Sequence, residues 1–507
     1  MSRQRVWLVT AGIMLSLLLA SMEGTVVATA MPTIVNQLGG FAMYSWVFSA
    51  FMLASTTTIP VFGKLSDLYG RRPVYTVAMG LFLMGSLLCG TAQSMPQLIA
   101  FRVVQGVGAG GVVPLAFTLI GDMFTLAQRT KLQGLFSGVW GVSALIGPLV
   151  GGFLVDQLSW QWVFYLNVVP GFLAAALVGL AWREPAQDAS TPAAHVDYAG
   201  AGLLMVGVVA LLLGLSTLGT AQGWALLGLA AVLLVGLVQV ERQARDPILP
   251  FPLFRDRIFA IACSQGVLAG GALFGSVSFV PLFVQAVLGT SATAAGVTLT
   301  PMTLGWTFAS ILGSRLLLRC SYRTLALTGM GLLTLGAGLM SRVGVEASQV
   351  SLLVNLALMG VGMGLSMPAF LIAVQSTVRP RDMGAATAAL QFSRNIGGAL
   401  GVSVMGVALS WHLAARLAAA GGEPAAISLD RLLDPMMRTA SSVIVDETLR
   451  NALAGALQGV FVIAVIAAAL GLAVTALAPH GRIDQLGTHR EGAEDRSQSL
   501  RTRLARE

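Results

Sequence analysis

Residues 63–73 read GKLSDLYGRRP, a short polar segment between two apolar runs that cover residues 44–62 and 74–90. Each run approaches the roughly 20 residues that a helix needs to cross the hydrocarbon core of a bilayer. Similar runs follow one another along most of the chain. Because 56% of the 507 residues are hydrophobic and only 10% are charged, against about 25% in ordinary soluble domains, the sequence predicts an all-α polytopic membrane protein.

Counting these apolar runs predicts 14 transmembrane helices. The runs cover residues 6–30, 44–62, 74–90, 96–119, 133–155, 162–182, 198–218, 225–240, 258–287, 294–317, 325–340, 352–375, 385–411 and 452–478. Four regions are expected: an N-terminal six-helix bundle (1–184), an inserted helix pair with its linkers (185–257), a C-terminal six-helix bundle (258–478) with a long outer loop (412–451), and a disordered tail (479–507).

The distribution of basic residues predicts the orientation in the membrane. The net charge of +8 comes from Lys and Arg residues scattered between the apolar runs, so nucleic acid is not expected as a partner. Short loops rich in Lys and Arg stay on the cytoplasmic side. Most of the basic residues fall in alternate loops when both termini are placed in the cytoplasm, and we expect a multi-pass protein of the bacterial cytoplasmic (inner) membrane.

Two opposite charges lie within predicted spans, where an ionised side chain costs on the order of 3 kcal/mol. At a rise of 1.5 Å per residue, Glu23 and Arg102 lie at similar depths, roughly 10 Å below the outer ends of their helices. Burial favours a protonated carboxyl group, whereas a nearby guanidinium favours the ionised form. A change in their separation would therefore load and release a proton. The alternative is a static structural ion pair.

Polar and aromatic side chains within spans are candidates for the lining of a central cavity. Such a cavity suits lipophilic ligands, although each aromatic residue is also compatible with packing or lipid contact, and Arg394 with a contact between helices. The candidates are Trp46, Phe51, Gln105, Trp140, Asn167, Phe283, Gln285, Trp306, Gln391 and Arg394.

The segment 63–73 closely resembles the signature loop of major facilitator transporters. The resemblance implies two six-helix bundles around a central cavity, with the inserted pair outside them. It also implies a cytoplasmic latch, in which an aspartate and an arginine of the loop meet an acid at the inner end of the fourth span and a helix start in the second half. An ordinary basic loop is the alternative. The corresponding residues here are Gly63, Asp67, Gly70, Arg71, Arg72 and Asp122. The second-half counterpart, GSRLLLRCSYR at residues 313–323, lacks the aspartate, so a one-sided latch is expected.

Three further stretches resemble motifs of this family, and one of them resembles the first-span signature of a subgroup, the fourteen-helix drug:proton antiporters. RVVQGVGAG at 102–110 resembles the motif whose arginine is implicated in proton transfer, and MEGTVVATAMP at 22–32 resembles the first-span signature, with Glu23 in place of the common aspartate and Ala28 in place of an asparagine. GPLVGG at 147–152 resembles an antiporter motif, whose members here are Gly147, Pro148, Gly151 and Gly152.

The resemblance implies a proton-coupled antiporter that exports lipophilic drugs or toxic compounds, monovalent cations or neutral molecules, by alternating access. An exporter of a lipid, siderophore or metabolite, and a receptor that transports nothing, are alternatives. An enzyme is not expected, because the four histidines have no metal-ligand spacing and no nucleophile motif is present, and neither a cofactor nor a metal is predicted. The expected partners are the lipid bilayer, protons and small lipophilic substrates. We expect a monomer. The sequence does not decide whether accessory export proteins take part.

Overall fold

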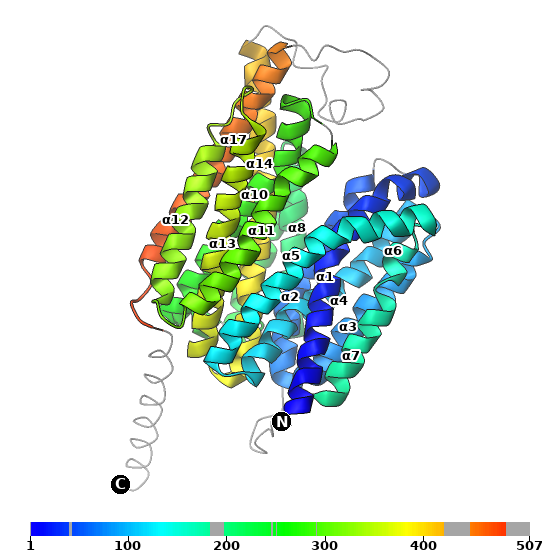
Figure 1. Cartoon of the computed structure of the whole chain (residues 1–507), viewed down its shortest axis with the longest axis vertical. Coiled ribbons are helices and arrows are strands. Elements are labelled where there is room, and N and C mark those ends of the chain that lie inside the picture. The colour runs from blue at the N-terminus through cyan, green and yellow to red at the C-terminus, as the bar shows by residue number, and fades with distance from the viewer. Residues whose placement is uncertain are drawn as a thin grey trace.

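The chain folds into two groups of long helices that stand side by side (Figure 1). The computed structural model describes residues 2–39, 43–182, 197–244, 247–249, 251–290, 292–419 and 447–482, and these contain helices, turns and connections but no β-strand. The prediction of an all-α chain is confirmed.

The first group contains seven helices, most of them longer than the apolar runs because polar turns extend their ends. Its members are α1 (Arg3–Leu38), α2 (Tyr44–Tyr69), α3 (Arg71–Gly90), α4 (Met95–Met123), α5 (Leu126–Gln157), α6 (Trp162–Tyr165) and α7 (Val168–Ala181). The sixth predicted span is divided between α6 and α7, with Leu166 and Asn167 at the break. This break matters for the site, because it places a polar side chain at membrane depth.

The second group contains the helices from α10 onward. Its members are η2 (Phe251–Arg255), α10 (Arg257–Leu282), η3 (Phe283–Val287), α11 (Ala292–Leu316), α12 (Tyr322–Met340), α13 (Gln349–Thr377), η4 (Pro380–Asp382), α14 (Met383–Ala419) and α17 (Glu447–Ala476). The end of α14 and the beginning of α17 extend into the predicted outer loop from its two sides. The rest of that loop, and nearly all of the predicted tail, lie outside the described residues.

The inserted pair, α8 (Tyr198–Ser216) and α9 (Ala221–Gln243), packs at the seam between the two groups, where α8 contacts both α2 and α14. Leu204, Val208 and Leu212 of α8 form a small apolar cluster with Ile396 of α14. Polar contacts join the end of α9 to the linker that follows it. Glu241, only 2% exposed, accepts backbone N–H bonds from Ile248 and Leu249 at 3.1 and 3.3 Å.

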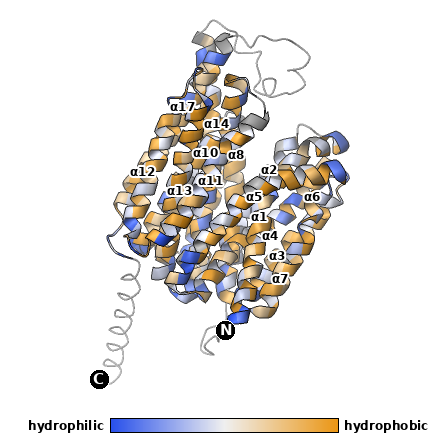
Figure 2. Ribbon diagram, viewed as in Figure 1, coloured by the Kyte–Doolittle hydropathy of each residue, from blue (hydrophilic) through white to orange (hydrophobic). Residues whose placement is uncertain are grey.

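Helices of this length and composition belong in a membrane. Hydrophobic residues cover the middle of the helices, and hydrophilic residues gather toward their ends (Figure 2). In the described part of the chain, 12 helices are long and apolar enough to cross a bilayer. Helices α5 and α11 occupy predicted spans but are not among the 12, so the count of 14 spans stays a prediction.

The contacts of Glu241 predict that this carboxylate holds the end of α9 against the linker that leads to the second helix group. Replacing Glu241 with Ala leaves two backbone N–H groups of the linker without their acceptor, and we expect a loss of about 1–3 kcal/mol in stability. Thermal unfolding of the purified protein in detergent measures this change. Gln239→Ala, at an exposed position on the same helix, is the control and should leave the melting temperature unchanged. An unchanged melting temperature for Glu241→Ala would contradict the assignment.

Candidate functional site

A buried ion pair lies at the centre of the first helix group. Glu23 on α1 is 3% exposed and Arg102 on α4 is 1% exposed. The Arg102 Nη1 donates to Glu23 Oε1 and also to Gln105 Oε1 at 2.7 Å, while its Nε donates to the Val47 carbonyl at 3.1 Å. The guanidinium also stacks on the Phe51 ring at 4.1 Å from its centroid, a cation–π contact that favours the charged form.

The second oxygen of Glu23 is held by a side chain from the helix break. Asn167, the residue before α7, donates to Glu23 Oε2 at 2.8 Å and to Ser86 Oγ at 2.9 Å. Gln105 donates to the same Ser86 hydroxyl at 3.1 Å. We call Glu23, Ser86, Arg102, Gln105 and Asn167 the Glu23 network. Its five members come from α1, α3, α4 and the start of α7, so a change at the carboxylate reaches most of the first group.

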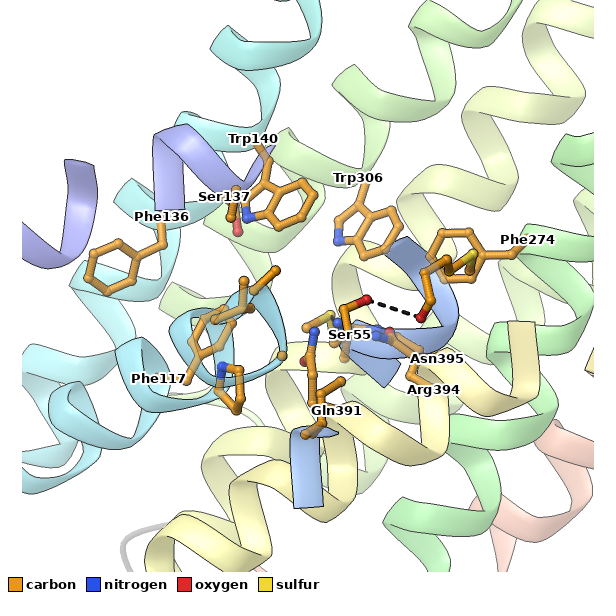
Figure 3. A pocket seen from close by; sticks show the side chains of 18 of the residues that line it. Ser55, Phe117, Phe136, Ser137, Trp140, Phe274, Trp306, Gln391, Arg394 and Asn395 are labelled. Carbon is orange, nitrogen blue, oxygen red and sulfur yellow. Dashed lines mark hydrogen bonds between the residues drawn. The ribbon is translucent and has the colours of Figure 1, made fainter. Parts of the chain in front are cut away.

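A separate cavity of about 430 Å³ lies between the two helix groups. Aromatic side chains supply much of its wall, and Trp140 of α5 and Trp306 of α11 lie to one side of Gln391, Arg394 and Asn395 of α14 (Figure 3). Of the residues predicted to line a cavity, those that do so are Phe51, Trp140, Trp306, Gln391 and Arg394.

The other five candidates are placed elsewhere, which corrects the predicted lining. Gln105 and Asn167 belong to the Glu23 network, since each finds a buried hydrogen-bonding partner there. Trp46 lies near the beginning of α2 and is 43% exposed, a position typical of tryptophan at a membrane interface. Phe283 and Gln285 lie in the π-helical turn η3 after Pro281, and this turn directs Phe283 into the apolar core of the second group.

Phe51 joins the network to the cavity. Its ring covers the Arg102 guanidinium, and the same residue belongs to the cavity lining. Neither Glu23 nor Arg102 is among the residues that line the cavity. Phe51 on α2 therefore lies between the cavity and the ion pair in this conformation.

Arg394 differs in its partners from Arg71 and Arg102, which are buried. Its Nη1 donates to the thioether of Met367 at 2.5 Å, and its Nε is buried without a hydrogen-bond partner. The described residues that line the cavity include no Asp or Glu, so Arg394 is the charged group among them. The cavity wall consequently carries an uncompensated positive charge.

The polar segment 63–73, which forms the end of α2, Gly70 and the start of α3, contacts the second helix group at the end of the molecule where the N-terminus lies (Figure 1). Arg71 Nε donates to Asp122 Oδ2 at 2.9 Å, and its Nη1 donates to Asp67. The carboxylate of Asp67 accepts the backbone N–H groups of Gly384 and Ala385 at 2.9 and 2.7 Å. These groups open α14, where unpaired N–H donors and the helix dipole favour an anion.

Glycines allow this close approach between α2 and α14. A Cβ atom on Gly63 would lie 2.9 Å from the Gly384 carbonyl oxygen. Gly70 has a φ of 92°, a conformation that side chains disfavour, and it separates α2 from α3. Arg72 is exposed next to Arg71. The structure thus brings together Asp67, Arg71 and Asp122, as expected of the latch, and adds the Pro380 carbonyl, to which Arg71 Nη2 donates at 3.3 Å.

The stretch 147–152 lies on α5 where this helix crosses α1. A Cβ atom on Gly147 would contact the Thr25 side chain, and one on Gly151 would contact Thr29 and the Val26 carbonyl. Gly152 faces open space, and the Pro148 side chain lies outside the described part. The glycines therefore permit a close α1–α5 contact beside Glu23.

Comparison with known proteins agrees with this architecture. The family model of the Major Facilitator Superfamily matches residues 13–402. The Multidrug transporter protein MdtP of Bacillus subtilis (strain 168) is 39% identical over 411 residues, which cover 80% of this chain and 75% of that protein. Multidrug resistance protein 3 of the same organism is 38% identical over 404 residues, which cover 78% of each. The solved structure of the proton:xylose symporter XylE has a TM-score of 0.62 at 12% identity, over 95% of this chain and 98% of that chain, which is a likeness of fold.

The geometry at Asp67 predicts that this carboxylate holds the two helix groups together at one end. Asp67→Asn removes the negative charge from Arg71 and from the start of α14, and we expect the closed arrangement of this end to lose at least about 1.4 kcal/mol, a tenfold change in its equilibrium. Electron–electron distance measurements between spin labels at Tyr69 and Arg381 would report the change as a new population at longer distance.

Asp382→Asn is the matched control for this experiment. Asp382 pairs with Arg379, but that arginine side chain is 49% exposed, and exposed ion pairs contribute little. The control should keep the distance distribution of the unmodified protein. If Asp67→Asn also keeps it, Asp67 does not hold the two groups together.

Proposed function

This chain belongs to the major facilitator superfamily, and we propose that it exports lipophilic compounds by alternating access in exchange for protons. The chain is a polytopic integral membrane protein of a transporter family, and the expectations of the major facilitator fold and of a protein that is not an enzyme are confirmed by this membership. The observation that carries the proposal is the buried Glu23–Arg102 pair next to a cavity between the two halves.

Glu23 is the proposed proton carrier. An ionised carboxylate is stable in this environment only while a counter-charge stays close. When Arg102 moves away, the proton becomes the alternative partner of Glu23. The network supports such an exchange because both donors have other acceptors. Arg102 also donates to the Val47 carbonyl and to Gln105, and Asn167 also donates to Ser86. Breaking the ion pair therefore leaves few polar groups without a hydrogen bond.

Phe51 supplies the proposed connection between substrate and proton. Displacing its ring removes the cation–π contact from Arg102, so a ligand that moves Phe51 changes the balance between the ion pair and a protonated Glu23. The reverse also holds. Protonation of Glu23 frees Arg102 to move, and the Phe51 ring that packs on Arg102 can then move as well. Coupling of this kind is reciprocal by thermodynamic necessity.

The latch-closed arrangement corresponds in this proposal to the state that is shut toward the cytoplasm. We assign the end that holds Asp67 and the N-terminus to the cytoplasm, in agreement with the Lys and Arg residues of the loops. The membrane is proposed to be the bacterial cytoplasmic membrane, with the chain working as a monomer. Protons that enter gain about 2.3 kcal/mol per 100 mV of membrane potential, which supports export against a gradient.

The cavity narrows the range of proposed substrates. A volume of about 430 Å³ and aromatic walls suit drug-sized apolar molecules. Of the two classes predicted from the sequence, neutral compounds meet no electrostatic obstacle. Monovalent cations would face Arg394, and Glu23 is not among the lining residues that could compensate it.

Glu23→Gln should uncouple transport from the proton gradient, because glutamine has a similar shape but cannot exchange a proton. In proteoliposomes that contain the purified protein, we expect proton movement with substrate to disappear and gradient-driven accumulation of a lipophilic dye to fall by at least about tenfold. Exchange of labelled for unlabelled dye should persist. Luminal pH and dye fluorescence, recorded together, measure both effects.

Glu346→Gln is the control, since it makes the same chemical change at an exposed glutamate. It should transport dye and protons like the unmodified chain. Proton movement that continues at an unchanged rate in Glu23→Gln would show that another group carries the proton.

A further inference from the structure

We infer that the cavity selects organic anions, with the Arg394 guanidinium as the counter-charge of the substrate's acidic group. The inference deepens the proposed export function and rests on it. It names amphiphilic monoanions, molecules with one carboxylate, sulfonate or similar group on an apolar aromatic body.

Arg71, Arg102 and Arg394 differ in the counter-charges that surround them. Arg102 has the carboxylate of Glu23, and Arg71 has those of Asp67 and Asp122. Arg394 has a thioether, which is a weak acceptor, and a buried Nε with no partner. An uncompensated cation at membrane depth is costly and is retained where it has a task. The missing anion is supplied by the ligand.

The surroundings of Arg394 fit the head of such a ligand. Gln391, Arg394 and Asn395 are spaced three and four residues apart, so they share one face of α14, and all three belong to the cavity lining. Their amide and guanidinium groups offer several N–H donors in one patch. A guanidinium can bind a carboxylate through two parallel hydrogen bonds, a geometry that an uncharged ligand group does not reproduce.

The aromatic parts of the wall fit the apolar body of the ligand. Phe274 packs against Trp306 with their ring centroids 6.3 Å apart, and Trp140 and Phe117 belong to the same lining. Figure 3 shows these rings around the space next to Arg394. A flat aromatic anion can therefore place its ring system among the aromatic side chains while its acidic group meets α14.

The charge of the substrate decides how the membrane potential drives transport. If a monoanion leaves while one proton enters, two charges move in the favourable direction, and each 30 mV or so of potential supports a tenfold gradient. If a monocation leaves for one proton, no net charge moves. Dependence on potential thus separates an anion exporter from a cation exporter, even with the same proton carrier.

The experiment compares two fluorescent dyes with one pyrene skeleton, the anionic pyrene-1-sulfonate and the cationic trimethyl(pyren-1-ylmethyl)ammonium. Inside-out proteoliposomes of the full chain take up dye under an imposed pH gradient, with a lumen-positive potential set by potassium and valinomycin or without it. We expect proton-coupled uptake of the anion that increases at least about tenfold with the potential. Cation uptake should be slower and insensitive to potential.

Variants test whether Arg394 selects the charge. Arg394→Gln should raise KM for the anion by at least about tenfold and should not raise KM for the cation, and Arg394→Lys should restore much of the anion affinity. An equal loss for both dyes would instead assign Arg394 to helix packing, since its backbone lies close to Gly270 of α10, and would overturn the inference.

A second variant keeps the arginine in place in case its removal prevents folding. Gln391→Glu puts a carboxylate one turn before Arg394, where it can neutralise the guanidinium, and should shift preference from the anion to the cation. Gln391→Met is the neutral control and should keep the preference for the anion. Proton-coupled uptake of the cation alone by the unmodified chain would overturn the inference and leave the proposed function intact. If neither dye moves and no protons move, the proposed function fails as well.

Discussion

A charge inside a bilayer must find its counter-charge within the protein, and this constraint organises the molecule. Lipid offers no hydrogen bonds, so a buried ion needs partners from neighbouring helices or from a bound ligand. Arg71 and Arg102 illustrate the first case, each drawing a carboxylate from a different helix. The helices are consequently fixed at two points, at one end by the latch and at membrane depth by the Glu23 network. Both points are made of bonds that a proton or a displaced helix can break.

Close backbone approach is the second requirement, because these polar contacts form only where helices nearly touch. Gly63 brings α2 to the start of α14, and Gly147 and Gly151 bring α5 to α1 beside Glu23. A larger residue at any of these positions would separate the helices and lengthen the contacts around them. Small residues at helix crossings and buried ions are thus two parts of one arrangement.

Sequence reasoning succeeded where the signal was local or depended on helix geometry. All latch residues except Asp122 stand in one recognisable segment, and a rise of 1.5 Å per residue put Glu23 and Arg102 at a common depth before their helices were placed. It failed where tertiary direction mattered. Gln105 and Asn167 are polar residues within apolar runs, and nothing in the pattern told whether they face a cavity or a buried carboxylate. Ser86 was missed because a single serine in a helix bonds to its own backbone as readily as to a partner. Phe283 was misplaced because the π-helical turn after Pro281 changes the face of the helix.

Helix α14 connects the two ends of the proposed cycle. Its first N–H groups are held by Asp67, and Arg394 follows ten residues later, roughly 15 Å along the axis. Its partner in the latch, α2, carries both Asp67 and Phe51, so the two helices joined by the latch also present the guanidinium and the ring that face the cavity. In the proposed cycle, separation of these two helices at the latch moves Arg394 relative to Phe51. The charge proposed to meet the substrate thus belongs to the second half, and the carboxylate proposed to meet the proton belongs to the first. Relative motion of the halves is therefore what links the two.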